Sequence, residues 1–259
     1  MREILEDCSE ITQGTIFSNA KSNDYNKDVY GILINGRCDI EHPQHYDTLL
    51  YLPIIPYDMW ESKPAMKKIL NHKYNDILNV LEGYRNFFSY EAVLYLPEHT
   101  EEIIDKYLKK EKEKNRAKNA IFFMTLYKKA ELNVDFISSE EKAFKDVFFS
   151  DFEALKKRLI DNNLPDAYYL ENVDFQDQSM QRIKRWVVLV TEIHSIPRKA
   201  LKNLKNGIDL GRESYLRSFF GTDELVIPCA TLKSPFIEHL IQKVESLFRV
   251  GVDRAEFFD

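Results

Sequence analysis

The sequence is poor in cysteine, proline and glycine. It has three cysteines, nine prolines and eight glycines among 259 residues. Cys8, Cys38 and Cys229 are far apart and lack the CxxC spacing of zinc and redox motifs. This number and spacing disfavour a secreted disulfide framework and favour a reducing compartment. No segment is rich enough in proline, glycine or serine to predict a flexible linker.

Long hydrophobic runs are also missing. The longest, residues 120–127, is far shorter than the ~18 residues that a membrane span requires. The charged N-terminal sequence MREILEDCSEITQG lacks the apolar core of a secretory signal. We therefore expect a cytoplasmic protein that has no membrane partner.

The signature motifs of several large enzyme classes do not occur either. The sequence has no Walker loop and no GxGxxG, GxSxG, HExxH or kinase pattern, which disfavours a nucleotide hydrolase or a dehydrogenase. We accordingly expect no cofactor and favour a non-enzymatic function. The 36 basic and 42 acidic residues give a formal charge of -6. That charge argues against nucleic-acid binding over the whole surface, although one local basic face is compatible with it.

The residues that are present predict a substantial core with strands near the N-terminus. The composition is 44% hydrophobic and 13% aromatic. Two β-rich runs, 29–34 and 49–55, predict buried strands, and Asn35-Gly36 is a turn dipeptide between them. Pro53 and Pro56 predict that the second run forms an edge strand or ends early.

Residues 62–163 have mainly helical patterns. Pro64 suits a first helical turn, and apolar residues then recur at helical spacing up to Gly83. The exception is 92–96, which predicts a short strand. Further helices are predicted from the capping residues Thr100, Ser138 and Ser150, the last two in S-x-x-E capping boxes.

Strand patterns return at 167–170, 185–193 and 224–227, and Ser195 with Pro197 predicts a short helix between the last two. A final helix is predicted from Ser234 to Gly251. Its apolar stripe consists of Phe236, Ile237, Leu240, Ile241, Val244, Leu247 and Phe248.

These patterns together predict an α+β protein. The β-rich segments 1–61 and 164–259 are each too small to fold alone, so we expect them to combine into one small, partly closed β-barrel with a C-terminal helix. Residues 62–163 would form a helical lobe inserted between two strands. Closure of the barrel would protect the sheet edges.

Short motifs at both ends of the chain resemble a poorly characterised bacterial family. ITQGTIF, YGILINGRCDIEH and YLPIIP follow its N-terminal QGxI…CDI…P pattern, and WVVLVTEIHSIP and SPFIEHLIQKVESLFRVGV resemble its closing strands and helix. The sequence departs from the family at 35–37, where Asn-Gly-Arg replaces the usual Ser/Thr-Gln before Cys-Asp. The resemblance implies a PemK-like, SH3-type barrel and a setting beside signalling or anti-phage defence genes. PemK-type toxins cleave RNA.

Cys38, Asp39 and His194 are the candidate catalytic residues. A cysteine nucleophile needs a base beside it, and His194 ends a predicted strand that the barrel would place near Cys38. Cys38, His42 and His45 offer a C-x3-H-x2-H set, but this spacing matches no common zinc arrangement, so no metal is predicted. A small buried thiol at a strand end is the simplest role for Cys38.

Two basic stretches are candidate anion sites. Residues near Pro197 are predicted to bind phosphate or an acidic partner: Arg198, Lys199, Lys202 and Arg212. The run from Lys106 to Lys118 predicts either a solvated helix with i,i+4 ion pairs or, with Tyr107, a local nucleic-acid face.

The leading hypothesis is therefore a non-enzymatic protein-interaction subunit of a bacterial regulatory or anti-phage defence system, acting with another protein of the same pathway. One alternative is a toxin-like nuclease acting on RNA or DNA. The other is a small-molecule or nucleotide sensor.

Overall fold

The computed structural model describes residues 5–6, 10–41, 47–132, 138–171 and 185–255. The chain has an α+β fold. It divides into two compact units, one formed by residues 1–57 with 158–259 and the other by residues 58–157. We call these the sheet unit and the helical unit.

The sheet unit contains all the strands among the described residues. Its elements are β1 (Leu5–Glu6), β2 (Thr15–Phe17), β3 (Tyr30–Leu33), α1 (Arg37–Glu41), β4 (Thr48–Pro56), β5 (Ala167–Glu171), β6 (Arg185–Leu189), β7 (His194–Pro197), α9 (Ala200–Leu204), β8 (Ile208–Asp209), the 3-10 helix η2 (Ser214–Phe219), β9 (Leu225–Val226), β10 (Pro228–Leu232) and α10 (Phe236–Ala255).

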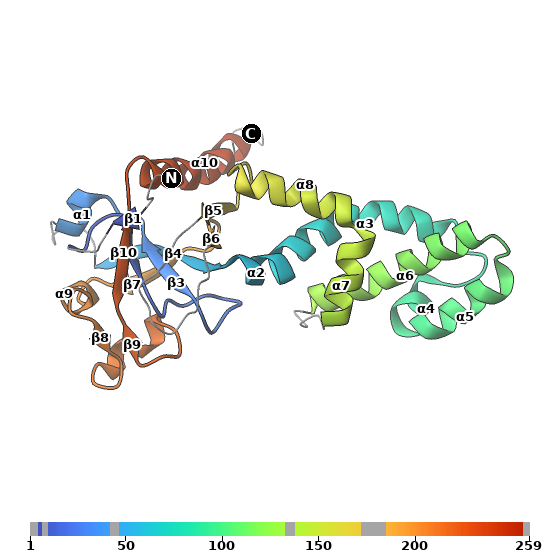
Figure 1. Cartoon of the computed structure of the whole chain (residues 1–259), viewed down its shortest axis with the longest axis horizontal. Coiled ribbons are helices and arrows are strands. Elements are labelled where there is room, and N and C mark those ends of the chain that lie inside the picture. Colours follow the sequence, from blue (N-terminus) through green and yellow to red (C-terminus); the bar gives the residue numbers. More distant parts are fainter. Residues whose placement is uncertain (1–4, 7–9, 42–46, 133–137, 172–184, 256–259) are drawn as a thin grey trace. The chain divides into compact units, whose positions relative to one another are not determined.

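Strands from both ends of the chain share one antiparallel sheet, which is curled into a half-barrel. Its order is β1-β10-β2-β3-β4-β6-β5, and β7 also pairs with β4. In Figure 1 the blue N-terminal strands lie beside the orange-red β10. On the other side of β3, Ile54 of β4 is in register with Val188 of β6. The strands of residues 5–56 therefore complete their pairing with strands from the second half of the chain.

The predicted limit on the 49–55 run is wrong, because β4 is a nine-residue strand with partners on both sides. The N–H of Ile34 donates to the carbonyl of Leu50 at 3.1 Å. Because bonded pairs alternate along an antiparallel ladder, Pro53 directs its nitrogen away from β3. On that side β4 changes partner, from β7 at Tyr51 to β6 at Ile54. Pro53 thus lies between the β7-paired and β6-paired parts of β4, where its missing N–H breaks no strand pairing.

The core of the sheet unit lies between the sheet and α10. Ile237, Leu240 and Val244 of the predicted stripe are buried there beside Tyr30 and Trp186. Each such aliphatic side chain contributes about 1.5–3 kcal/mol of burial free energy. The stripe does not extend to Phe248, which is 60% exposed, and α10 continues through Gly251 instead of ending there.

One edge of the described sheet is covered by a side chain. β5 is an edge strand, and its residue Tyr169 points its backbone N–H and C=O outward. The N–H donates to Asn162 Oδ1 at 2.6 Å, and the carbonyl accepts from Asn162 Nδ2 at 3.4 Å. The Asn162 amide thus occupies this edge position as a neighbouring strand would.

The helical unit consists of helices and turns in the described residues. Its elements are α2 (Tyr57–Trp60), the π-helical turn η1 (Glu61–Ala65), α3 (Met66–Glu82), α4 (Tyr90–Tyr95), α5 (Pro97–Tyr107), α6 (Glu111–Glu131), α7 (Ser138–Val147) and α8 (Phe149–Ile160). The chain passes between the units within α2 and within α8. No helix in the described residues is both long and apolar enough to cross a membrane.

Four local predictions in the helical unit are wrong, the first being the cap at Ser150, which lies inside α8. Residues 92–95 belong to α4 instead of a strand and Leu96 follows its end, because the Ser89 side chain accepts from the Ala92 N–H at 3.2 Å and caps that helix. Thr100 is buried inside α5, which begins at Pro97. Pro64 lies in η1 between two helices, where a wider turn tolerates its missing N–H.

The segment around Ser195 also differs from its prediction. Ser195 and Pro197 belong to β7, because the first half of β4 offers them a pairing edge from Thr48 to Tyr51. The short helix that follows, α9, begins only at Ala200. Strand β10 was not predicted, because Pro228 resembled a strand end when it in fact begins one.

Candidate functional site

Cys38 lies on the surface of the sheet unit. The predicted polar turn after β3 contains the short helix α1, in which Asp39 and Ile40 donate their N–H groups to the carbonyl of Gly36 at 3.0 and 3.1 Å. Ile40 is the buried residue of this helix, whereas Cys38 is exposed. The expectation of a buried thiol is therefore wrong. His42 and His45, which would complete the metal set, lie outside the described residues.

The guanidinium group of Arg198 binds the backbone of this helix. Its Nη2 donates to the carbonyl oxygens of Asp39 at 2.5 Å and Ile40 at 2.9 Å. These carbonyls belong to the C-terminal end of α1, where cations satisfy unpaired oxygens. Arg198 also donates its backbone N–H to Asp47 at 2.9 Å. The structure thus brings Arg198 and Asp39 together through the Asp39 backbone.

His194 lies at the other end of β7, in a different environment. Its Nε2 is 2.7 Å from Glu192 Oε1, and its ring stacks on Tyr51 with centroids 5.4 Å apart. Extended strands rise ~3.3 Å per residue, so the His194 and Arg198 backbones are roughly 13 Å apart. The side-chain contacts of His194 are therefore with Glu192 and Tyr51.

Glu192 connects His194 to the loop that follows β2. Its carboxylate accepts from the backbone N–H of Asn23 at 2.5 Å and from the Ser22 hydroxyl at 3.2 Å. Tyr51 contacts the same loop, where its hydroxyl accepts from the Lys21 N–H at 3.1 Å. Burial raises the pKa of Tyr51, so its hydroxyl keeps its proton to a higher pH than an exposed tyrosine does. We call Glu192, His194, Tyr51 and the loop residues that they bind the loop anchor.

Two of the other three predicted anion-binding residues, Lys199 and Arg212, have partners within the sheet unit. Lys199 Nζ lies 4.2 Å from the centroid of the Tyr215 ring, and Lys202 is exposed on α9. Arg212 Nε pairs with Asp209 at 3.3 Å. Among the described residues there is also no group of three His, Cys, Asp or Glu side chains that could hold a metal ion.

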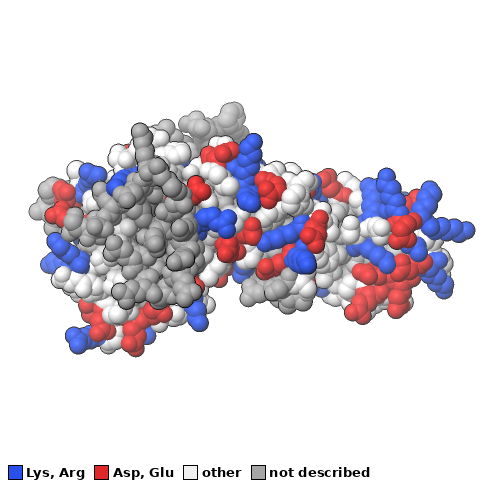
Figure 2. Space-filling model, viewed as in Figure 1, with Lys and Arg blue, Asp and Glu red and all other residues white. Residues whose placement is uncertain are grey.

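The basic run of the helical unit is divided and partly neutralised. α5 ends at Tyr107 and α6 begins at Glu111, so the run spans a break between two helices. Asp105 accepts from Lys118 at 2.7 Å and lies 3.8 Å from Lys114. The hydrogen bond from Lys118 lowers the pKa of Asp105. Figure 2 shows acidic and basic side chains interspersed on the visible face of these helices.

Exposed aromatic residues beside lysines form a feature that the sequence patterns did not reveal. The Phe87 and Tyr107 rings have centroids 6.2 Å apart, and Lys106 Nζ lies 5.3 Å from the Tyr107 centroid. On neighbouring helices, Lys128 Nζ lies 3.7 Å above the ring of Tyr95. These residues form two groups about 16 Å apart along α5, because Leu96 precedes that helix and Tyr107 is its last residue. We call the two groups together the aromatic–lysine surface: Phe87, Tyr95, Leu96, Lys106, Tyr107 and Lys128.

The apolar members of this surface are accessible. Phe87 is 43%, Tyr95 69%, Leu96 58% and Tyr107 55% exposed. Only the adjacency of Lys106 and Tyr107 was visible in the sequence. The Lys128–Tyr95 pair depends on the packing of α4 against α6, which no local pattern specifies.

Comparisons of the chain with protein-family models, with curated proteins and with solved structures found no match.

Proposed function

We propose that this chain is a protein-interaction subunit whose helical unit contacts the partner through the aromatic–lysine surface. The observation that carries the proposal is the exposure of Phe87 beside Tyr107 at one end of α5 and of Tyr95 with Leu96 at the other end. Grouped exposed apolar side chains mark interaction sites, and aromatic residues are enriched at interface centres. In this proposal the curled sheet is a partly closed SH3-like barrel.

Charge supports a protein partner over a nucleic acid. Residues 58–157 contain equal numbers of basic and acidic residues, so the formal charge of -6 falls on the sheet unit. A nucleic-acid site requires a concentrated basic stripe. Lys106 and Lys128 instead border aromatic rings, where their ammonium groups can meet carboxylates at the rim of a protein interface.

The toxin-like nuclease is supported less well. It requires Cys38, Asp39 and His194 to act on one substrate, whereas His194 contacts Glu192 and Arg198 contacts the α1 backbone. Its direct test is expression in bacteria. Growth arrest that Asp39→Ala or His194→Ala relieves would favour the nuclease over the interaction subunit.

Affinity purification from cells of the native source tests the interaction proposal. The tagged wild-type chain should retain a stoichiometric protein partner, and Phe87→Ser/Tyr107→Ser should lose most of it. Tyr215→Ser is a matched control, because Tyr215 is 51% exposed and also has a lysine over its ring, but lies in the sheet unit. A wild-type chain that is recovered alone, or equal partner recovery with the double variant, would overturn the proposal.

A further inference from the structure

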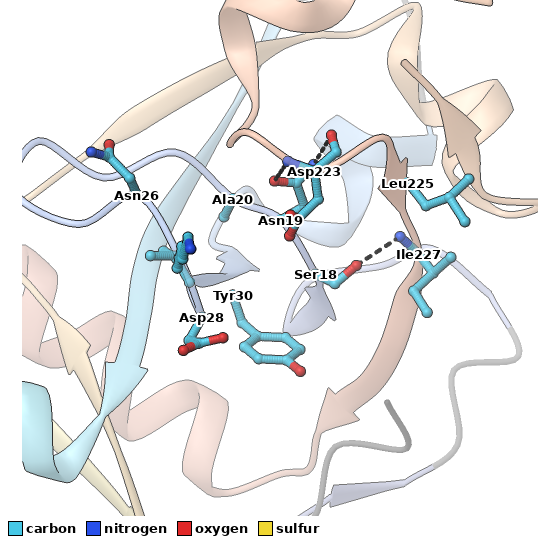
Figure 3. A pocket seen from close by; sticks show the side chains of 11 residues that line it. Ser18, Asn19, Ala20, Asn26, Asp28, Tyr30, Asp223, Leu225 and Ile227 are labelled. Atoms are coloured by element: carbon cyan, nitrogen blue, oxygen red, sulfur yellow. Dashed lines mark hydrogen bonds between the residues drawn. The ribbon is translucent and has the colours of Figure 1, made fainter. Parts of the chain in front are cut away.

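The sheet unit has a pocket of about 220 Å³ that none of the predicted sites uses. It lies between the segment that joins β2 to β3 and the segment that leads through β9 to β10. A volume of this size has room for several waters or one small solute. Figure 3 shows Asp28 and Tyr30 on one side of this space and Asp223 on the other.

Hydrogen bonds between segments far apart in the sequence fix the pocket walls. Asn19 uses its whole amide on the Asp223 backbone, donating at 2.8 Å and accepting at 3.2 Å. Thr222 donates its hydroxyl to the Asn26 carbonyl at 3.1 Å. A Cβ at Gly221 would lie 2.3 Å from Asn19 Oδ1, so this close approach requires glycine. Long-range hydrogen bonds of the fold therefore hold the walls of the pocket in place.

The two ends of the loop that forms one wall have an unusual backbone conformation. Asn19 has a φ of 53° and Asp28 a φ of 58°. Both lie in the left-handed region, which asparagine and aspartate tolerate better than other non-glycine residues. The loop anchor holds the middle of the same loop at Lys21, Ser22 and Asn23. The wall is thus fixed at its ends and at its centre.

The lining of the pocket offers complementary charges and an apolar side. Asp28, which is half-buried, and Lys27, which is exposed, are charged residues of this lining. Ser18 is 93% buried, since its exposed fraction is 7%, and its hydroxyl accepts from the Ile227 N–H at 3.0 Å. Because the Ser18 oxygen is the acceptor in this bond, its O–H can donate a hydrogen bond to a ligand. Four apolar side chains complete the lining: Ala20, Val29, Leu225 and Ile227.

We propose that this pocket binds a small zwitterion of the α-amino-acid class with a short apolar side chain. Asp28 accepts from its ammonium group, and Lys27 with the Ser18 hydroxyl binds its carboxylate. The apolar side of the pocket takes the side chain. A simple amine would make no contact with Lys27 or the Ser18 hydroxyl, and a simple carboxylate would face Asp28 and Asp223 without an ammonium group beside them. The proposal concerns the sheet unit and does not depend on the interaction surface of the helical unit.

A ligand-observed NMR titration of the full chain with three related probes tests the proposal. L-Valine has both charges, isobutylamine has only the ammonium group, and isovalerate has only the carboxylate. We expect saturable binding of L-valine and binding at least about tenfold weaker of the other two, since each loses one charged contact. No saturable L-valine binding, or equal binding of isobutylamine or isovalerate, would overturn the proposal.

Matched variants locate the binding. Asp28→Asn keeps a side chain suited to the left-handed backbone and should weaken L-valine binding about tenfold or more. Asp24→Asn, an exposed change in the same loop outside the pocket lining, should leave it within about twofold. Lys27→Gln tests the other charge without touching Asp28 and should also weaken binding. Equal loss in Asp24→Asn and Asp28→Asn, or full binding by both pocket variants, would contradict the assignment.

Discussion

The carboxylate of Glu192 accepts a hydrogen bond from the backbone N–H of Asn23, 169 residues earlier in the chain, at 2.5 Å. The same carboxylate binds His194 and Ser22. One side chain thus links β7 to the loop that lines the pocket. His194, selected from the sequence as a catalytic base, has a structural partner here that explains its position.

Glu192→Ala should release this loop. The Asn23 N–H, the Ser22 hydroxyl and the His194 ring would lose their common acceptor, at a cost of about 1–3 kcal/mol in the free energy of unfolding. Hydrogen exchange of the Asn23 amide should accelerate by about tenfold or more. Glu224→Ala removes an exposed carboxylate and is the control. Unchanged exchange at Asn23 would show that the loop does not depend on Glu192.

Arg198→Met should destabilise α1. Methionine retains an apolar stem but leaves the Asp39 and Ile40 carbonyls without their donor, so the free energy of unfolding should fall by about 1–3 kcal/mol. Lys202→Met, an exposed change on the adjoining helix, should stay within about 0.5 kcal/mol. Denaturant unfolding measures both. Equal stabilities would mean that Arg198 is available for the predicted role in phosphate binding.

Because Tyr168 is buried, we expect the folded protein to lose stability at alkaline pH. Burial raises its pKa from 10.0 to about 12, so the folded state keeps a proton that the unfolded state loses. The contribution of Tyr168 is present below pH 10 and should be lost as pH rises towards 12, by on the order of 1–2 kcal/mol. Tyr168→Phe should lose less stability than the wild type between pH 9 and 11.

Exposed Tyr95 gives the comparison for this measurement, because Tyr95→Phe should follow the wild-type pH dependence. Parallel curves for the wild type and Tyr168→Phe would mean that the Tyr168 hydroxyl reaches solvent before the protein unfolds.

The sequence predicted the parts of the fold that have a clear hydrophobic period. The strands around Ile32 and Val188 and the helices around Leu70 and Leu240 lie where their patterns placed them. The errors came where pairing or packing overrode a local signal. Pro53 is tolerated because its strand changes partner there, and Ser195 joined a strand because β4 extends beyond β6.

The candidate sites were harder to predict, because they depend on which segments meet. The sequence named Asp39, His194 and Arg198 individually, but His194 and Arg198 are far apart because the segment between them is an extended strand on β4 and not the predicted helix. Glu192, the partner of His194, is only two residues away in the sequence. The loop that Glu192 also binds is at Asn23, and no local pattern connects these two segments. The pocket lining likewise combines residues about 200 positions apart, such as Asn19 and Asp223.

Cross-linking of the native complex with a lysine-reactive reagent, followed by mass spectrometry, tests the proposed function most directly. Lys106 and Lys128 border the proposed interface, whereas Lys199 and Lys202 lie in the sheet unit. We predict that cross-links to the partner concentrate on Lys106, Lys128 and their neighbours in α5 and α6. Cross-links that concentrate on Lys199 and Lys202 would contradict the assignment of the interface to the helical unit.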